Sequence, residues 1–93
     1  MTKFNQGAQE RISFYETRFR NESTSQLAEN FSSLVNSRGW TAERSFYSTA
    51  LINEFQRRGV DISAICGQEN GNLVIRYMNV AFDEDENALK PCK

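Results

Sequence analysis

The sequence predicts an α+β fold: three helices followed by a C-terminal two-stranded antiparallel β-hairpin. Two observations predict this class. Apolar residues recur three or four positions apart in three segments of the first 58 residues, and polar or glycine-containing breaks separate those segments. From Val60 onward, two segments rich in Val, Ile and aromatic residues flank a loop bounded by glycines, which is typical of a hairpin.

The first helix is predicted over residues 4–20. Its apolar stripe has helical spacing and consists of Phe4, Ala8, Ile12, Tyr15 and Phe19. Phe14 lies off this stripe. We therefore expect the first helix to make contacts on a second side.

The second helix is predicted over residues 24–37. Ser23 and Gln26 have the spacing of a capping box at its start, and Gly39 is placed to end it in the left-handed conformation. The side chains expected to be buried are Leu27, Phe31, Leu34 and Val35.

The third helix is predicted from its N-cap Thr41 to Arg58, and Gly59 ends it. One face is apolar and consists of Phe46, Tyr47, Ala50, Leu51 and Phe55. The opposite face is polar but uncharged and consists of Ser45, Thr49, Asn53 and Gln56.

The hairpin is predicted from strands over Val60–Cys66 and Asn72–Phe82, joined by the loop Gly67–Gly71. The second strand carries apolar residues in both alternation phases, so both of its faces should be covered. Residues 83–93 begin with four acidic residues and are expected to form a flexible C-terminal tail. The predicted organisation is one domain over residues 1–82, followed by this tail.

A chain of 93 residues, 39% of them hydrophobic, is long enough for one hydrophobic core. Eleven Lys and Arg against twelve Asp and Glu give a formal charge of −1, so no overall field draws the protein towards nucleic acid or a membrane. The chain has no histidine, the commonest general base and metal ligand. The residues expected to form the core are Phe19, Phe31, Leu34, Phe46, Leu51, Phe55, Ile65, Ile75 and Tyr77.

No pattern in the sequence predicts an enzyme, a cofactor or a metal site. Nucleophilic catalysis needs an activating neighbour, and Cys66 has only Arg76 as a candidate. Residues 83–87 match the first three ligand positions of an EF-hand loop, but Ala88 stands where that loop requires glycine. The acidic run is therefore interpreted as a solvated end to a hydrophobic strand.

We expect a cytoplasmic protein with no membrane association. The first ten residues contain no apolar stretch typical of a secretory signal, and no run approaches the roughly 18 apolar residues of a membrane span. Cys66 and Cys92 are expected to be free thiols, as is usual in a reducing compartment.

One functional hypothesis is DNA binding. The predicted element order resembles that of a winged-helix domain, and residues 37–40 form a turn of helix-turn-helix length. The polar face of the third helix would read bases, because Asn and Gln pair with adenine, and nearby arginines would contact phosphates. The residues expected to contact DNA are Arg38, Arg44, Ser45, Thr49, Asn53, Gln56 and Arg57. The net charge and a loop, Gly67–Gly71, without Lys or Arg argue against this hypothesis.

The hypothesis we favour is a small non-enzymatic protein-interaction or regulatory module. The predicted second strand is longer than the first, so it should present unpaired edge groups near residues 79–82. The partner would be another protein or a second copy. A twofold dimer is preferred to a monomer in which the first helix covers the second face of the hairpin. The residues expected at the interface are Phe14, Trp40, Val74, Met78, Val80 and Phe82.

Overall fold

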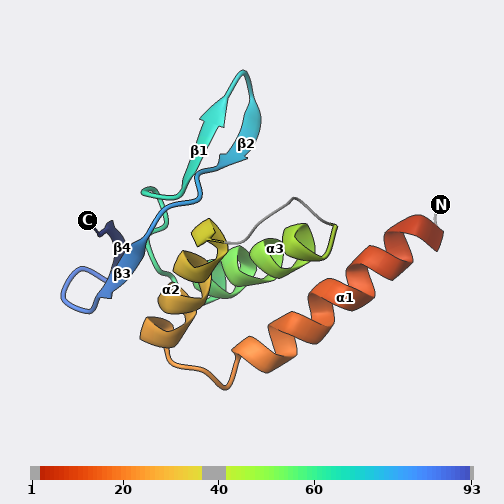
Figure 1. Ribbon diagram of the computed structural model, residues 1–93, viewed down its shortest axis with the longest axis horizontal. Coiled ribbons are helices and arrows are strands. Elements are labelled where there is room, and N and C mark those ends of the chain that lie inside the picture. The colour runs from red at the N-terminus through yellow and green to blue at the C-terminus, as the bar shows by residue number, and fades with distance from the viewer. Residues whose placement is uncertain (1–2, 37–41, 93) are drawn as a thin grey trace.

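The computed structural model describes residues 3–36 and 42–92, and it has the predicted α+β class. The helical elements are α1 (Lys3–Phe19), α2 (Thr24–Ser33), the 3₁₀ turn η1 (Leu34–Asn36) and α3 (Ala42–Arg57). Two antiparallel hairpins follow: β1 (Cys66–Glu69) with β2 (Asn72–Ile75), and β3 (Val80–Asp83) with β4 (Ala88–Pro91) (Figure 1). The predicted helix stop Gly39 and N-cap Thr41 lie outside the described residues.

The start of α2 confirms the predicted cap. Ser23 Oγ accepts a hydrogen bond from the backbone N–H of Gln26 at 3.0 Å. The Gln26 side chain does not return to Ser23, as a full capping box would require, but donates to Asn30 at 3.1 Å. The α-helix ends at Ser33, where the chain tightens into η1, and Val35 is exposed rather than buried as expected.

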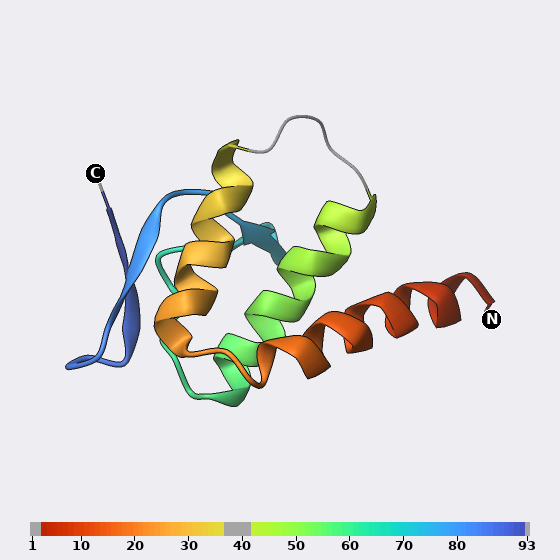
Figure 2. The ribbon, with the colours of Figure 1, turned by 60° about the horizontal axis from the view of Figure 1, so that its bottom comes forward.

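The β3–β4 hairpin and the three α-helices lie side by side across the molecule. In Figure 2 the β3–β4 hairpin, α2, α3 and α1 follow one another, and α1 lies beside α3. The N-terminal half of α1 extends past the start of α3 (Figures 1 and 2). The β1–β2 hairpin stands away from the helices and joins the body only at its open end (Figure 1).

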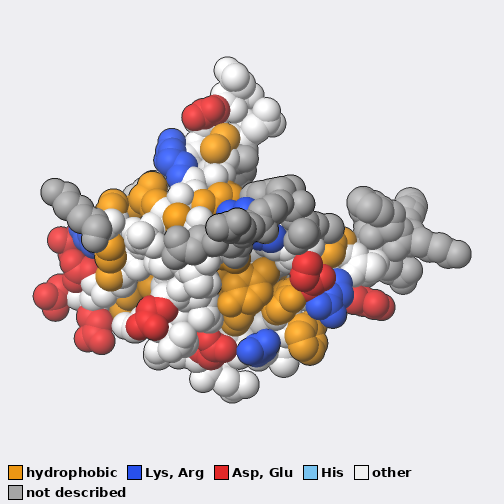
Figure 3. Space-filling model, in the orientation of Figure 1, with side chains coloured by type: hydrophobic (Ala, Val, Ile, Leu, Met, Phe, Trp, Pro, Cys, Tyr) orange, Lys and Arg blue, Asp and Glu red, His pale blue; other side chains and the backbone are white. Residues whose placement is uncertain are grey.

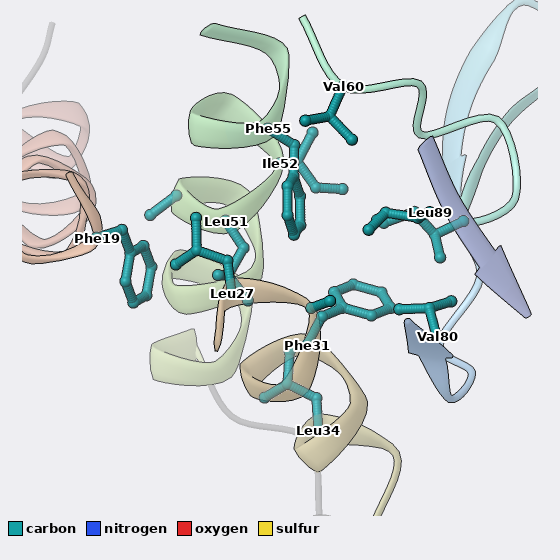
Figure 4. Packing of buried hydrophobic residues seen from close by; sticks show 13 residues of the cluster. Phe19, Leu27, Phe31, Leu34, Leu51, Ile52, Phe55, Val60, Val80 and Leu89 are labelled. Carbon is teal, nitrogen blue, oxygen red and sulfur yellow. The ribbon is translucent and has the colours of Figure 1, made fainter. Parts of the chain in front are cut away.

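The core lies among the helices, the segment after α3 and the β3–β4 hairpin (Figure 4). Six of the predicted core residues are buried: Phe19, Phe31, Leu34, Leu51, Phe55 and Ile65. Ile75 and Tyr77 are partly buried and pack against this cluster. Leu27 and Ala50, predicted on the apolar faces of their helices, are also buried. Buried apolar residues that were not predicted are Ala28, Ile52, Val60, Val80, Ala88 and Leu89.

Phe46 is the predicted core residue that the structure places elsewhere, because it is only half-buried and does not belong to the core cluster. The buried face of α3 is centred near Leu51, about 140° around the helix from Phe46 at about 100° per residue. Two polar residues, Ser48 and Glu54, are buried on that face, at 1% and 2% exposure. The apolar pattern therefore predicted a buried face of α3 that is rotated towards Phe46 from the face that is buried in the structure.

The structure has two hairpins where the sequence analysis expected one. Of the predicted first strand, Val60–Cys66, only its last residue is in β1, and the predicted second strand is interrupted over residues 76–79. The turn between β1 and β2 consists of Asn70 and Gly71 alone, with φ angles of 54° and 81°. Positive φ at both positions is the type I′ turn that matches the twist of paired strands, and it favours Asn-Gly. The loop is therefore shorter than predicted.

Residues 83–93 contain β4 instead of the expected flexible tail. Its residues Ala88 and Leu89 are 5% and 3% exposed. The acidic run forms the turn between β3 and β4, where Asp83 Oδ1 accepts hydrogen bonds at 3.0 and 3.4 Å from two of the backbone N–H groups that follow it. The position of Leu89 in the core makes this segment part of the domain.

Candidate interaction surface

The polar face of α3, predicted to contact DNA, is partly occupied by α1. Asn53 donates a hydrogen bond from Nδ2 to Glu16 of α1 at 2.7 Å. Ser45 and Thr49 are half-buried, while Gln56 is exposed. This arrangement leaves less of the face open to a DNA groove than the sequence alone indicated.

Two of the arginines expected to contact phosphates have partners within the chain, and Arg38 lies outside the described residues. Arg44 Nη2 donates to the carbonyl oxygen of Leu34 at 3.0 Å, and its guanidinium lies 4.6 Å from the centre of the Tyr77 ring. Arg57 Nε donates to Glu54 at 3.0 Å. Arg44, Asn53 and Arg57, three of the seven residues predicted to contact DNA, thus have partners within the chain.

Glu54 is the centre of a buried ionic network. Besides Arg57, it accepts a hydrogen bond from Arg58 Nε at 2.7 Å, and Arg58 in turn donates at 2.9 Å to both Thr24 Oγ1 and the carbonyl oxygen of Phe19. The hydrogen bond from Arg57, reinforced by Arg58 and opposed by burial, holds the pKa of Glu54 below its ordinary value. The network fastens the end of α3 to the turn between α1 and α2.

A second polar cluster fastens α1 to the start of α3. Arg11 Nε donates to both carboxylate oxygens of Glu43, at 3.2 and 3.3 Å, and Tyr15 donates its hydroxyl to the same carboxylate. These hydrogen bonds, the one from Arg11 above all, lower the pKa of Glu43. Phe14 is 54% exposed, with the Arg11 guanidinium 5.4 Å from its ring centre.

The predicted interface residues do not form one surface. Val80 is buried in the core, Phe14 lies on α1, which α2 and α3 separate from β3–β4 (Figure 2), and Trp40 lies outside the described residues. The remaining three are half-buried: Val74, Met78 and Phe82. The unpaired edge expected near residues 79–82 is partly closed, because β3 pairs with β4 on one side and Val80 bonds with Ser32 on the other.

The open strand edge is instead on β2. β1 and β2 pair in the register Cys66↔Ile75 to Glu69↔Asn72, and the N–H of Arg76 continues the ladder to the carbonyl of Ile65 at 2.7 Å. Hydrogen-bonded pairs alternate along an antiparallel ladder, so residues 67 and 74 are bonded to each other while residues 73 and 75 direct their N–H and C=O groups away from β1. Within the described residues this sheet has only two strands, and β1 is the only strand paired with β2.

Three outward positions on β3 and β4 have a partner within the chain or lack a donor. On β3, the N–H of Val80 donates to Ser32 Oγ at 2.8 Å, and the Ser32 hydroxyl donates to the Val80 carbonyl at 3.0 Å. On β4, the outward N–H of Leu89 donates to the carbonyl of Asp61 at 3.0 Å. Pro91, also in an outward position of β4, has no N–H to present.

Side chains of the β1–β2 hairpin pack closely against its own strands and against the core. Gly67 lies opposite Val74, and the Arg76 guanidinium covers Gly67 so closely that a Cβ there would come within 2.6 Å of it. Cys66, on the first residue of β1, packs against the core, and burial raises the pKa of its thiol. β2 itself, Asn-Leu-Val-Ile, carries no charged side chain.

A hollow of about 470 Å³ lies at the β3–β4 turn and is lined by Ala81, Phe82, Asp83, Glu84, Asp85 and Lys90. Acidic side chains gather at this end of the molecule (Figure 3). Among the described residues, no group of three or more Cys, Asp or Glu side chains is arranged to hold a metal ion. No helix in the described part of the chain is long and apolar enough to cross a membrane.

Comparison with known proteins found no family model, no curated protein and no solved structure that matches this chain.

Proposed function

We propose that this protein is a small non-enzymatic interaction module that binds its partner by strand addition at the outer edge of β2. The observation that carries the proposal is the row of backbone groups that residues 73 and 75 direct away from β1. An extended segment laid along this edge would continue the sheet. Its main-chain hydrogen bonds would supply the affinity.

The composition of β2 supports this proposal. Exposed strand edges in soluble proteins are usually protected by charged side chains, proline, a bulge or a covering segment. β2 has neither charge nor proline, and its pairing with β1 has no bulge. A two-stranded hairpin is also marginally stable in water by itself, so a further strand would stabilise it.

The proposal keeps the cytoplasmic location expected from the sequence. Both Cys66 and Cys92 are free thiols, which suits a reducing compartment.

DNA binding through α3 is the alternative proposal, and it has less support. Arg44, Asn53 and Arg57 would first have to leave their partners within the chain. A mobility-shift titration of a labelled duplex with up to about 50 µM protein at low salt tests it, because DNA affinity falls steeply as salt rises. A salt-sensitive shift would favour DNA binding, and no shift would reject it.

The strand-addition proposal is tested with peptides selected from a displayed library on the immobilised protein, followed by affinity measurements on two proline variants. Leu73→Pro removes an N–H that faces away from β1, so the hairpin ladder is kept. Gln68→Pro is the matched control, because the N–H of Gln68 also faces outward, but from β1 on the opposite edge.

We expect Leu73→Pro to weaken binding of the selected peptides about tenfold, the effect of one lost hydrogen bond and a blocked edge, while Gln68→Pro leaves it unchanged. Peptides that bind both variants alike, or a selection that returns no binding peptide, would contradict the proposal.

A further inference from the structure

We infer that the strand added to β2 is β2 of a second copy of this chain, running antiparallel with residue 73 opposite residue 75 of the copy. This inference rests on the proposed function and names the partner for it. The protein would then be a twofold dimer whose axis passes beside Val74, with a four-stranded sheet in the order β1, β2, β2 of the copy, β1 of the copy.

The hydrogen-bond pattern of β2 leaves one register that uses the whole edge. Residues 73 and 75 are the two positions of this four-residue strand that direct backbone groups outward. Pairing 73 with 75 of the copy, and 75 with 73 of the copy, engages both positions on both chains, and each pair exchanges two hydrogen bonds. Pairing residue 75 with itself places 73 opposite Tyr77 of the copy, and pairing residue 73 with itself places 75 opposite Gly71 of the copy, both outside β2.

The side chains are compatible with this register. Val74 comes directly opposite Val74 of the copy in a non-hydrogen-bonded pair, where side chains approach most closely. A β-branched pair is favourable there. Asn72 comes opposite Arg76 of the copy, so no two like charges face each other across the axis.

Dimer formation would also stabilise the β1–β2 hairpin. The hairpin stands away from the helices (Figures 1 and 3), and only its base, through Cys66 and Ile75, packs against the core. Self-association would place β2 in the interior of a four-stranded sheet, a size typical of stable sheets. Because the paired edges are short compared with a standard interface, we expect a dissociation constant on the order of 100 µM.

The axis beside Val74 makes a charge-swap experiment decisive. In a Val74→Lys dimer two ammonium groups would lie opposite each other, and in a Val74→Glu dimer two carboxylates, whereas a mixture of the two variants brings opposite charges together. Gln68→Lys and Gln68→Glu are the matched controls on the other edge of the hairpin. Circular dichroism melting of each variant verifies that it folds.

Sedimentation velocity from about 10 to 500 µM measures the outcome. We expect wild-type protein and both Gln68 variants to show a concentration-dependent shift from monomer to dimer. Each Val74 variant alone should associate at least about tenfold more weakly, and the equimolar mixture should recover dimer formation.

Wild-type protein that stays monomeric over this range would overturn the inference while leaving strand addition to a peptide intact. A dimer that tolerates both Val74 variants and Leu73→Pro would overturn the register and count against the β2 edge as the binding surface. If a Val74 variant fails to fold, the Leu73→Pro variant supplies the same comparison, because it should also prevent the dimer.

Discussion

The two hairpins of this protein have similar lengths but opposite relations to their surroundings. The β3–β4 hairpin lies against α2 and buries Val80 and Leu89 in the core. Ser32 bonds the outward N–H and C=O of Val80, Asp61 bonds the outward N–H of Leu89, and Pro91 has no N–H. The β1–β2 hairpin projects from the body, and no strand of the described residues pairs with the outer edge of β2. The difference is that Ser32 and Asp61 bond outward groups of β3 and β4, whereas no bond from the described residues is found for the outward groups of β2.

The largest expected loss of stability comes from a substitution in the β3–β4 hairpin, which packs into the core. Leu89→Ala, at 3% exposure, should lower the free energy of unfolding by about 3 kcal/mol, because it leaves a cavity beside the core cluster. Val74→Ala, at a half-buried position on the other hairpin, should lower it by less than about 1 kcal/mol. Urea denaturation of both variants measures the contrast, and equal losses would show that the two hairpins contribute alike.

The next effect tests whether Ser32 closes the edge of β3. Ser32→Ala leaves the N–H and C=O of Val80 without their partner next to the core, so we expect a loss of about 1–2 kcal/mol. Ser33→Ala is the control, because Ser33 is exposed and its hydroxyl donates only to Asn30 in the same helix. A change within about 0.5 kcal/mol is expected there. If the two variants proved equally stable, Ser32 would have no special role at this edge.

The turn of the open hairpin gives a smaller effect. Gly71 has a φ of 81°, so Gly71→Ala should destabilise the hairpin by about 1 kcal/mol through backbone strain alone, since no other atom lies within 4 Å of its Cβ position. Gly7→Ala, on an open helical position of α1, should instead stabilise the protein slightly. Thermal melts of the two variants that moved in the same direction would contradict the type I′ turn.

The smallest effect is the pH dependence that Asp61 contributes where it bonds to β4. The hydrogen bond that Ser63 donates from its backbone N–H holds the pKa of Asp61 below its ordinary value. Its stabilising contribution is therefore present above the unfolded pKa of about 3.9 and is lost as pH falls through the lower folded value. Protection of the Leu89 amide, corrected for intrinsic exchange, should decrease between about pH 5 and pH 3. Constant protection over that range would show that ionisation of Asp61 does not stabilise this part of the fold.

The helices were largely predictable because their signals are local. Ser23 caps α2 through a bond to a residue three positions on, and the stripe ending at Phe19 is a property of one helix. The buried face of α3 was misjudged because Glu54 is polar, and its burial depends on Arg57 and Arg58 being aimed at it by the folded chain. The spacing of apolar residues cannot predict an ionic network of this kind.

For the hairpins, too, local features were predictable from the sequence and features that depend on tertiary contacts were not. Asn70-Gly71 is a strong local signal for a two-residue turn, and it could have placed the turn of the first hairpin correctly. By contrast, Ala-Leu-Lys-Pro has little intrinsic strand propensity, and β4 forms because Asp61 and the core hold Leu89. The candidate surface was missed for a related reason, since only the register of β1 and β2 reveals which groups point outward.

Amide hydrogen exchange measured by NMR tests the central claim, that the outward N–H groups of β2 are open while those of Val80 on β3 and Leu89 on β4 are bonded. In dilute, monomeric protein the amides of Leu73 and Ile75 should exchange fast, while those of Val74, Val80 and Leu89 should be protected. Raising the concentration should then protect Leu73 and Ile75 selectively. Protection of Leu73 and Ile75 equal to that of Val74 in the monomer, or fast exchange at Val80 and Leu89, would contradict the account.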